Sequence, residues 1–493
     1  MTRKPFNELN FVNRFQQLPD ALYSPVEPQG LLNPKLVCAS SSAATLLDLD
    51  LSSLETPDIL NALSGNALHH SWRPIAMKYT GHQFGYYNPD LGDGRGLLIA
   101  EVENNEGEIW DLHLKGAGLT PYSRQGDGRA VLRSSIREFL CSEAMAALGI
   151  PTTRALCVID SDTPVYREKP ESGATILRLA STHIRFGHFE FCSFTQQYDL
   201  LKALADYVID QHYPELNDSD QPYLEFFKVT LNKTAELMAH WQSIGFAHGV
   251  MNTDNMSILG DTFDYGPFAF LDDCEPGFIC NHSDHQGRYA FNQQPNIANW
   301  NLAVLAQALL PLVDKQSLVS ELENYADIFR KHFVEKMAKK LGLDWMLNGE
   351  HEPELNAIID NTMKMLSQGK MDYCIFFRKL GSIHNSDTKN FLRNHTLDIL
   401  GFDSWYDQYM KLVALDMRTL DERQSAMNKV NPKYILRNYL AQNAIASAEQ
   451  GDYSLVNALH EVLQNPFDEQ PEYDSYSDFP PQWGKELEIS CSS

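Results

Sequence analysis

The sequence predicts an α+β fold with two lobes, a strand-rich lobe over residues 76–196 and a helical lobe over residues 197–315. The first observation behind this prediction is a pair of apolar runs, 97–102 and 109–115, separated by a turn-rich segment, which together indicate a β-hairpin. The second is a change of periodicity near residue 197, where apolar residues begin to recur at helical spacing. The change of periodicity therefore predicts the boundary between the lobes.

Three further segments flank these two lobes. Residues 1–75 are punctuated by Pro and Asn and are expected to form an N-terminal extension over the neighbouring domain. Residues 316–464 show mainly amphipathic helical patterns and are expected to form a helical C-terminal region. Residues 465–493 are rich in Pro and Asp, and we expect an irregular tail that carries Cys491.

Charge and hydropathy limit the partners of this 493-residue chain. Its 40 basic and 65 acidic residues give a net charge of −25, which repels nucleic acid and anionic membranes. No apolar run reaches the ~18–20 residues that cross a bilayer, and the N-terminus lacks the apolar core of a signal peptide. We therefore expect a cytoplasmic protein without nucleic-acid or membrane partners; composition does not define its oligomeric state.

A lysine and a glutamate in the strand-rich lobe are candidates for an ion pair. Lys115 ends the second strand of the predicted hairpin on its more polar face. Glu138 lies on a helix predicted from the spacing of Leu132, Ile136 and Phe139. Each could be an ordinary solvated side chain, but a strand-end lysine followed by a helix glutamate is also how kinases position ATP phosphates.

Two more strands are predicted, at 154–160 and 174–180.

The tetrapeptide Gly-Asp-Gly-Arg occurs twice, at 92–95 and at 126–129. The first copy opens the hairpin, where glycines allow backbone N–H groups to approach a phosphate. The second precedes the predicted helix, whose N-terminus attracts anions. Either copy alone is more simply explained as a tight turn. With Lys115 and Glu138 downstream, the two copies together favour a nucleotide phosphate.

The segment HGVMNTDN, residues 248–255, resembles the kinase catalytic loop H-R-D-L-x-x-x-N in part. His248 and Asn255 match, whereas Val250 stands where a kinase has its catalytic Asp. Asn255 and Asp264, the latter in a DYG segment, are hard oxygen donors suited to Mg²⁺ or Mn²⁺, although both residue types also form turns. The order of these elements predicts a two-lobed protein-kinase-like fold.

Two arginines add positive charge to this set. Arg178 lies on the predicted strand 174–180, and Arg185 follows it. An arginine on a strand usually covers a sheet edge or pairs with an acid. In so acidic a protein, however, Arg178 and Arg185 with Arg95 and Lys115 would make a more positive pocket than an ordinary kinase needs for its phosphates.

Five long segments resemble the selenoprotein O family of protein adenylyltransferases. They are GHQFGYYNPDLGDGRG, LKGAGLTPYSRQGDGRAVLRSSIREFL, ILRLASTHIRFGHFE, HGVMNTDNMSILGDTFDYGPFAFLDD and CNHSDHQGRYAFNQQP. The resemblance extends over essentially the whole chain. It implies a pseudokinase fold in which ATP is bound in reversed orientation. AMP would then be transferred from ATP to Ser, Thr or Tyr hydroxyls of protein substrates, with release of pyrophosphate.

The resemblance also implies roles for individual residues. Asp254 would be the proton acceptor, and Asn255 and Asp264 would hold the metal. The residues that would bind the nucleotide are Gly92, Gly94, Arg95, Lys115, Asp127, Gly128, Arg178, Arg185 and Asp264. A redox link between Cys491 and a cysteine near the active site is also implied, with Cys280 as the candidate and Cys274 as the less favoured one.

Three alternatives to AMP transfer stay open at this point. The chain could be a phosphotransferase that uses Asp254 as a displaced base, or a non-catalytic nucleotide-binding scaffold that lacks the kinase Asp. UMP transfer from UTP is a further alternative. Val250 cannot accept a proton, whereas Asp254 can.

Overall fold

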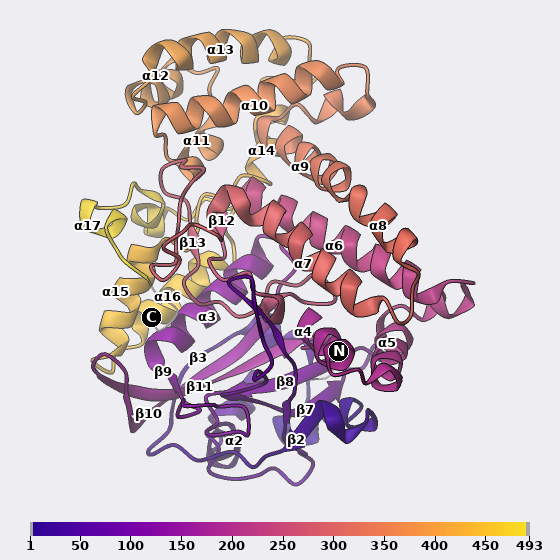
Figure 1. Cartoon of the computed structure of the whole chain (residues 1–493). Helices are drawn as coiled ribbons and strands as arrows, with labels where there is room; N and C mark the ends of the chain where they lie inside the picture. The colour runs from indigo at the N-terminus through magenta and orange to yellow at the C-terminus, as the bar shows by residue number, and fades with distance from the viewer. Residues whose placement is uncertain (1–2, 490–493) are drawn as a thin grey trace.

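A computed structural model describes residues 3–489, and a large antiparallel sheet forms the lower part of Figure 1. Seven strands follow the order β2-β4-β7-β8-β11-β10-β3, while β1 pairs with β7 and β9 with β11. The strands of this sheet are β1 (Asn10–Val12), β2 (Tyr23–Pro25), β3 (Lys35–Ala39), β4 (Ile75–Met77), β7 (Gly96–Glu103), β8 (Ile109–Lys115), β9 (Ala130–Val131), β10 (Arg154–Tyr166) and β11 (Pro170–Ala180).

The predicted β-hairpin is confirmed as β7 and β8, which pair with Gly96 opposite Lys115. The predicted strands 154–160 and 174–180 are confirmed within β10 and β11, which are longer than expected because they continue toward each other as a hairpin. The N-terminal stretch, expected as an extension over its neighbour, supplies three strands to this sheet. Of these, β3 pairs with β10 and β2 pairs with β4.

Helix α3 (Leu132–Ala147) packs against β10 and β11 and carries Glu138. Its apolar positions recur at helical spacing, and Ile136, Phe139 and Leu140 are buried in the main core. The helix ends before Gly149, which has φ +74°, a conformation that favours glycine. The helix predicted after the second Gly-Asp-Gly-Arg segment is therefore confirmed.

The chain then becomes helical, but it does so at Phe186, before the position near residue 197 that the periodicity predicts. Helices α4 (Phe186–Phe194), α5 (Tyr198–His212), α6 (Pro222–Ile244) and α7 (Gln294–Leu309) follow the sheet. Helix α6 ends at Gly245 in the left-handed conformation and leads directly into β12 (Phe246–Ala247). Strand β12 pairs with β13 (Ala269–Phe270), so the loop between them is anchored at both ends. The whole segment HGVMNTDN, residues 248–255, lies in this loop.

The C-terminal helices divide into two groups. Helices α9 to α14 contribute to a separate apolar core, toward the top of Figure 1, whereas α15 and α16 return to pack against α3. The remaining helices are α1 (Ser41–Leu46), α2 (Pro57–Leu63), α8 (Lys315–Glu323), α9 (Tyr325–Leu341), α10 (Glu352–Gly369), α11 (Tyr373–Leu380), α12 (Ser386–Asn394), α13 (Ile399–Val413), α14 (Leu420–Asn428), α15 (Asn438–Ala448), α16 (Ser454–Leu463) and α17 (Gln482–Lys485). Within residues 3–489, no helix combines the length and apolarity needed to span a membrane.

Candidate active site

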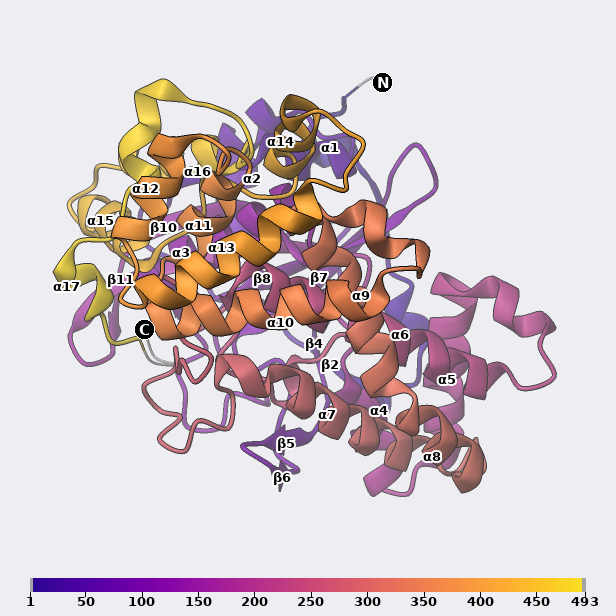
Figure 2. The ribbon, with the colours of Figure 1, turned by 90° about the horizontal axis from the view of Figure 1, so that it is seen from above.

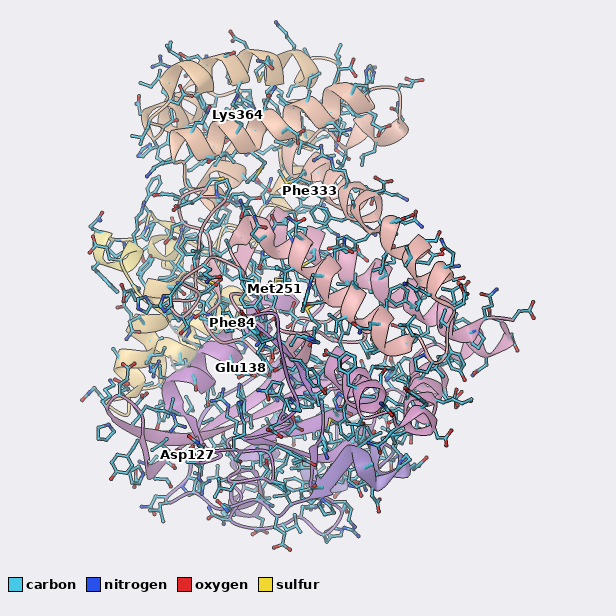
Figure 3. The ribbon with its side chains drawn as sticks, in the orientation of Figure 1. Phe84, Asp127, Glu138, Met251, Phe333 and Lys364 are labelled. Atoms are coloured by element: carbon cyan, nitrogen blue, oxygen red, sulfur yellow. The ribbon has the colours of Figure 1, made fainter. Side chains whose placement is uncertain are left out.

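A cavity of about 380 Å³ lies between the sheet and the β12–β13 loop. Its lining includes every residue that the sequence analysis assigned to nucleotide, cation or proton transfer, together with Val250. In Figure 3, Glu138 lies near the middle of the molecule, between the sheet and the helices, whereas Asp127 lies lower, beside the sheet. Segments far apart in the sequence therefore meet at one cavity.

Lys115 and Glu138 form the predicted ion pair between β8 and α3, and both are buried. Arg178 reaches the other oxygen of Glu138 at 3.2 Å. Burial alone would raise the pKa of Glu138, but the charges of Lys115 and Arg178 lower it overall. The carboxylate is thereby held ionised between two cations that line the cavity.

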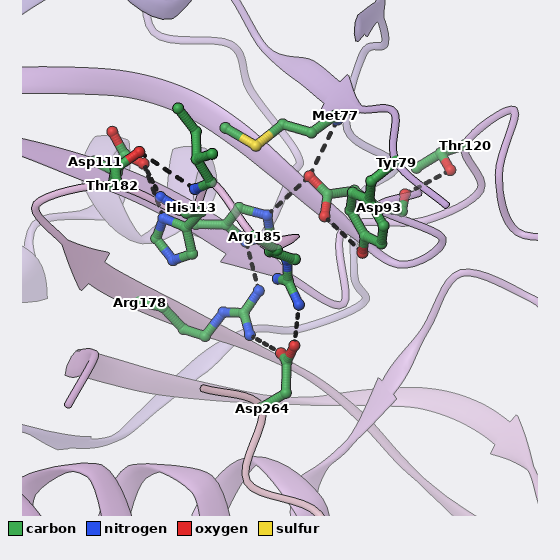
Figure 4. A network of polar contacts seen from close by, with 12 residues as sticks. Met77, Tyr79, Asp93, Asp111, His113, Thr120, Arg178, Thr182, Arg185 and Asp264 are labelled. Carbon is green, nitrogen blue, oxygen red and sulfur yellow. Dashed lines mark hydrogen bonds and ion pairs between the residues drawn. The ribbon is translucent and has the colours of Figure 1, made fainter. Parts of the chain in front are cut away.

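Asp264 of the DYG segment is held by two arginines (Figure 4). Arg178 Nη1 donates to Asp264 Oδ1 at 2.6 Å, and Arg185 Nη1 donates to Oδ2. Although burial opposes it, the charges of Arg185, Arg178 and Lys115 hold the pKa of Asp264 well below its usual range. Asp264 also has φ +53°, an unusual backbone conformation for a residue other than glycine, and such strain is concentrated at functional sites.

The first Gly-Asp-Gly-Arg turn is fixed by its buried aspartate. Asp93 accepts hydrogen bonds from the Met77 backbone N–H at 3.1 Å, from the Tyr79 hydroxyl at 3.3 Å and from His113 Nε2 at 3.1 Å. Arg178 can only donate and is 2.9 Å from His113 Nδ1, so the imidazole carries its proton on Nε2. Burial lowers the pKa of His113 and keeps it neutral. The turn is therefore fixed by hydrogen bonds that its buried aspartate accepts from the protein interior.

The second Gly-Asp-Gly-Arg turn is held by contacts of its exposed aspartate and of its arginine. Asp127 accepts two hydrogen bonds from Arg167, at 2.7 and 3.0 Å, and its side chain is 44% exposed. Arg129 donates to the backbone carbonyls of Gln29 and Gly30 at 2.7 and 3.1 Å. The carboxylate and guanidinium of this turn are thus occupied by protein groups, and its backbone is the part best suited to meet a ligand.

Asp254 is buried in the β12–β13 loop. Its Oδ2 accepts from Gln83 Nε2 at 3.1 Å, while its Oδ1 has no hydrogen-bond partner among residues 3–489. Burial raises the pKa of Asp254 to about 7. Arg185 donates to its backbone carbonyl at 2.8 Å, which joins the loop to the arginine that holds Asp264. A carboxylate with an unused acceptor oxygen and a pKa near neutrality is suited to accept a proton.

The donors for a cation are oxygens. Asn255 Nδ2 donates to the Val250 carbonyl at 3.0 Å, so only its Oδ1 is available as a ligand. Asp264 supplies carboxylate oxygens, and such hard donors fit Mg²⁺ or Mn²⁺. Within residues 3–489, no group of three or more His, Cys, Asp or Glu could hold a metal ion. Asn255 and Asp264, which both line the cavity, are therefore the oxygen donors that fit such a cation.

Several groups at the site were missed by sequence reasoning. Gln83, Tyr79 and His113 line the cavity, and Gln83 lies on the hairpin of β5 (Gly81–Gln83) and β6 (Tyr86–Asn88). The turn of this hairpin is Phe84–Gly85, with φ +51° and +84°. Positive φ at both positions is what a type I′ hairpin turn requires, but Phe-Gly is not a common signal for it.

Cys280 is buried close to the loop, and a Cβ added at Gly249 would lie 2.6 Å from its Sγ. Cys274 is also buried. Cys491 lies outside the described residues, so its pairing with Cys280 stays a prediction.

Comparison with known proteins gives a consistent result over the whole chain. The family model described as Protein adenylyltransferase SelO matches residues 5–464. Curated proteins named Protein nucleotidyltransferase YdiU are similar over 99% of this chain and 100% of their own length. Identity is 52% over 490 residues for Pseudomonas putida (strain GB-1) and 53% over 491 residues for Pseudomonas fluorescens (strain SBW25). It is 52% over 491 residues for Ectopseudomonas mendocina (strain ymp).

Proposed function

The chain belongs to the SelO family of protein adenylyltransferases, and from that premise we propose that it transfers AMP from ATP to hydroxyl side chains of other proteins. It is a nucleotidyltransferase with ATP as substrate and protein as acceptor. Pyrophosphate is the second product. We also propose that the strand-rich and helical parts form the two lobes of a protein-kinase-like fold, with the cavity between them.

The observation that carries the proposal is the pair Val250 and Asp254, both at the cavity. Val250 occupies the position of the kinase base and has no group that accepts a proton. Asp254 has a carboxylate, and its Oδ1 has no hydrogen-bond partner in the described part of the chain, residues 3–489. A site that keeps the phosphate-binding groups but moves the base supports a transfer with different geometry from that of a kinase.

The positive charges of the cavity support a reversed nucleotide. Arg95, Lys115, Arg178 and Arg185 all line it, and Arg178 and Arg185 are buried. A triphosphate bound with its γ end among these cations presents the α-phosphorus toward the loop that carries Asp254. The same cations stabilise the charge that develops on the leaving pyrophosphate.

Each protein group has one task in this scheme. Asp254 accepts the proton of the attacking hydroxyl while the oxygen forms its bond to the α-phosphorus and the bond to the bridging oxygen of pyrophosphate breaks. Glu138 holds Lys115 for the phosphates. Asn255 and Asp264 would hold a divalent cation, which supplies charge neutralisation to the phosphates when bound. Arg178 and Arg185 contact Asp264 and so set where its oxygens lie.

The test is labelling of a hydroxyl-rich unfolded protein, such as β-casein, with ATP that carries the label at either the α or the γ phosphorus. AMP transfer retains the α label on the acceptor and releases the γ label as pyrophosphate. Retention of the γ label would instead show a phosphotransferase, and retention of neither would support a non-catalytic scaffold. A parallel reaction with α-labelled UTP measures UMP transfer at the same site.

A further inference from the structure

The hairpin formed by β5 and β6 runs along the loop that contains Asp254. It projects from the body of the molecule in Figure 2. The His82 backbone N–H donates to Thr253 Oγ1 at 2.7 Å, and the Phe84 N–H donates to Asn252 Oδ1 at 3.2 Å. These bonds fix the hairpin against the loop on both sides of Gln83, so the Gln83 side chain has a defined position relative to Asp254.

A chain of three hydrogen bonds then leads from the hairpin to the carboxylate. The Asp90 backbone N–H donates to Asn88 Oδ1 at 3.0 Å. Asn88 Nδ2 donates to Gln83 Oε1 at 3.2 Å, and Gln83 Nε2 donates to Asp254 Oδ2 at 3.1 Å. A backbone N–H can only donate, so the first bond sets the orientation of both side-chain amides. Each amide must therefore present its NH₂ group toward Asp254.

We propose that Gln83 is a positioning residue that orients the Asp254 carboxylate for proton transfer, and that Asn88 fixes the orientation of the Gln83 amide. This inference rests on the proposed function of Asp254 as the base. Asp90 lies two residues before Gly92, the first residue of the first Gly-Asp-Gly-Arg turn. The three bonds therefore also connect the segment just before this turn to the proposed base.

No other side chain within residues 3–489 donates a hydrogen bond to the Asp254 carboxylate. The backbone beside it is glycine, and a Cβ at Gly81 would lie 2.9 Å from Asp254 Oδ1. Without the Gln83 amide the carboxylate would lose the one side-chain hydrogen bond that it accepts within residues 3–489. A reversed amide would place Gln83 Oε1 against a carboxylate oxygen, an arrangement in which two acceptors face each other without a proton.

The experiment measures pyrophosphate release and ATP affinity for Gln83→Met and Asn88→Leu. Gln83→Met preserves the length of the side chain and removes the donor. We expect kcat to fall about 10- to 100-fold, the range for loss of a hydrogen bond to a charged group. The KM and Kd for ATP should stay within about twofold, since the lost contact acts on the base. Asn88→Leu should lower kcat in the same direction by a smaller factor.

A double variant separates positioning from general damage to the fold. If Gln83 acts through Asp254, adding Gln83→Met to Asp254→Ala should change the residual rate by less than about twofold. Gln408→Met, the same substitution on the exposed face of α13, serves as the matched control and should leave kcat unchanged. Thermal denaturation of each variant verifies that it is folded.

Two outcomes would overturn the positioning role while leaving the base in place. In the first, Asp254→Ala is slow but folded Gln83→Met and Asn88→Leu both turn over like wild type. In the second, Gln83→Met weakens ATP binding as much as it lowers kcat, which makes Gln83 a nucleotide-binding residue. Wild-type turnover by Asp254→Ala would instead refute the proposed base, and the positioning role with it.

Discussion

The two Gly-Asp-Gly-Arg turns have the same four residues and line the same cavity, yet they are held in opposite ways. Asp93 in the first turn is 4% exposed and accepts hydrogen bonds from three groups of the sheet region. Asp127 in the second turn is exposed and pairs with Arg167. The aspartate at the same position of the motif is thus a buried hydrogen-bond acceptor in the first turn and part of an exposed ion pair in the second.

The arginines of the two turns also differ in their contacts with the protein. Arg95 is exposed at the cavity and has no side-chain hydrogen bond or ion pair among residues 3–489. Arg129 is bound to the carbonyls of Gln29 and Gly30. In the first turn the aspartate is buried and the arginine is available to a ligand. In the second turn the aspartate is exposed and the arginine is hydrogen-bonded to the backbone. A short motif therefore acquires its role from the residues that surround it.

The largest expected difference between the turns is in stability. Asp93→Ala leaves three donors buried without an acceptor, and we expect a loss of about 3–5 kcal/mol in the free energy of unfolding, as for a broken buried charged network. Asp127→Ala breaks a partly exposed ion pair and should cost about 1 kcal/mol or less. Urea denaturation of both variants measures the two values. Equal losses would show that the turns are supported alike.

The second difference concerns nucleotide affinity. Arg95→Ala should raise the Kd for ATP about tenfold, near the lower end for a hydrogen bond to a charged group, with the unfolding free energy within about 0.5 kcal/mol of wild type. Arg129→Ala should do the reverse, lowering stability by about 1 kcal/mol with little effect on affinity. Isothermal titration and denaturation of both variants decide this. Loss of affinity in Arg129→Ala alone would assign the ligand contact to the second turn.

The smallest expected effect is a pH dependence that distinguishes the two carboxylates. Burial alone would raise the pKa of Asp93, but the interaction with His113 and the charge of Arg185 lower this pKa below its usual value. A lowered folded-state pKa contributes stability that is complete above the unfolded pKa of ~3.9 and is lost as pH falls through the folded pKa.

The stability gap between wild type and Asp93→Asn should therefore be constant from pH 5 to 7 and should close as the solution is acidified below about pH 4. The pKa of Asp127 is also lowered, by its hydrogen bond to Arg167, but solvent screens that pair. The gap for Asp127→Asn should be small throughout. A wild type–Asp93→Asn gap that widened on acidification would contradict the ionised, hydrogen-bonded Asp93.

Periodicity and segment order were sufficient for part of this picture. The hairpin of β7 and β8 and the helix α3 follow from local apolar spacing, and the contact between Lys115 and Glu138 follows from their places on those elements. Each of these features depends on residues close together in the chain or on a strand and helix that pack in sequence order.

The features that sequence did not reveal depend on distant contacts. Strand β3 is fixed by pairing with β10, more than a hundred residues later, and short strands of this kind have weak local patterns. The partners of Asp93 and Asp127 come from other elements, so identical tetrapeptides could not be told apart. Gln83 lies on a short hairpin whose Phe-Gly turn gave no signal, and its role is defined only by where Asp254 lies.

The assignment on which the proposed function most depends is Asp254 as the acceptor of the hydroxyl proton. Its most direct measurement is the single-turnover rate of AMP transfer by Asp254→Ala, combined with the Kd of the same variant for ATP. We expect the rate to fall by about 10²–10⁴ while the Kd changes less than about twofold, because a base acts in the transition state. Wild-type turnover, or an ATP affinity that falls in parallel with the rate, would contradict the assignment.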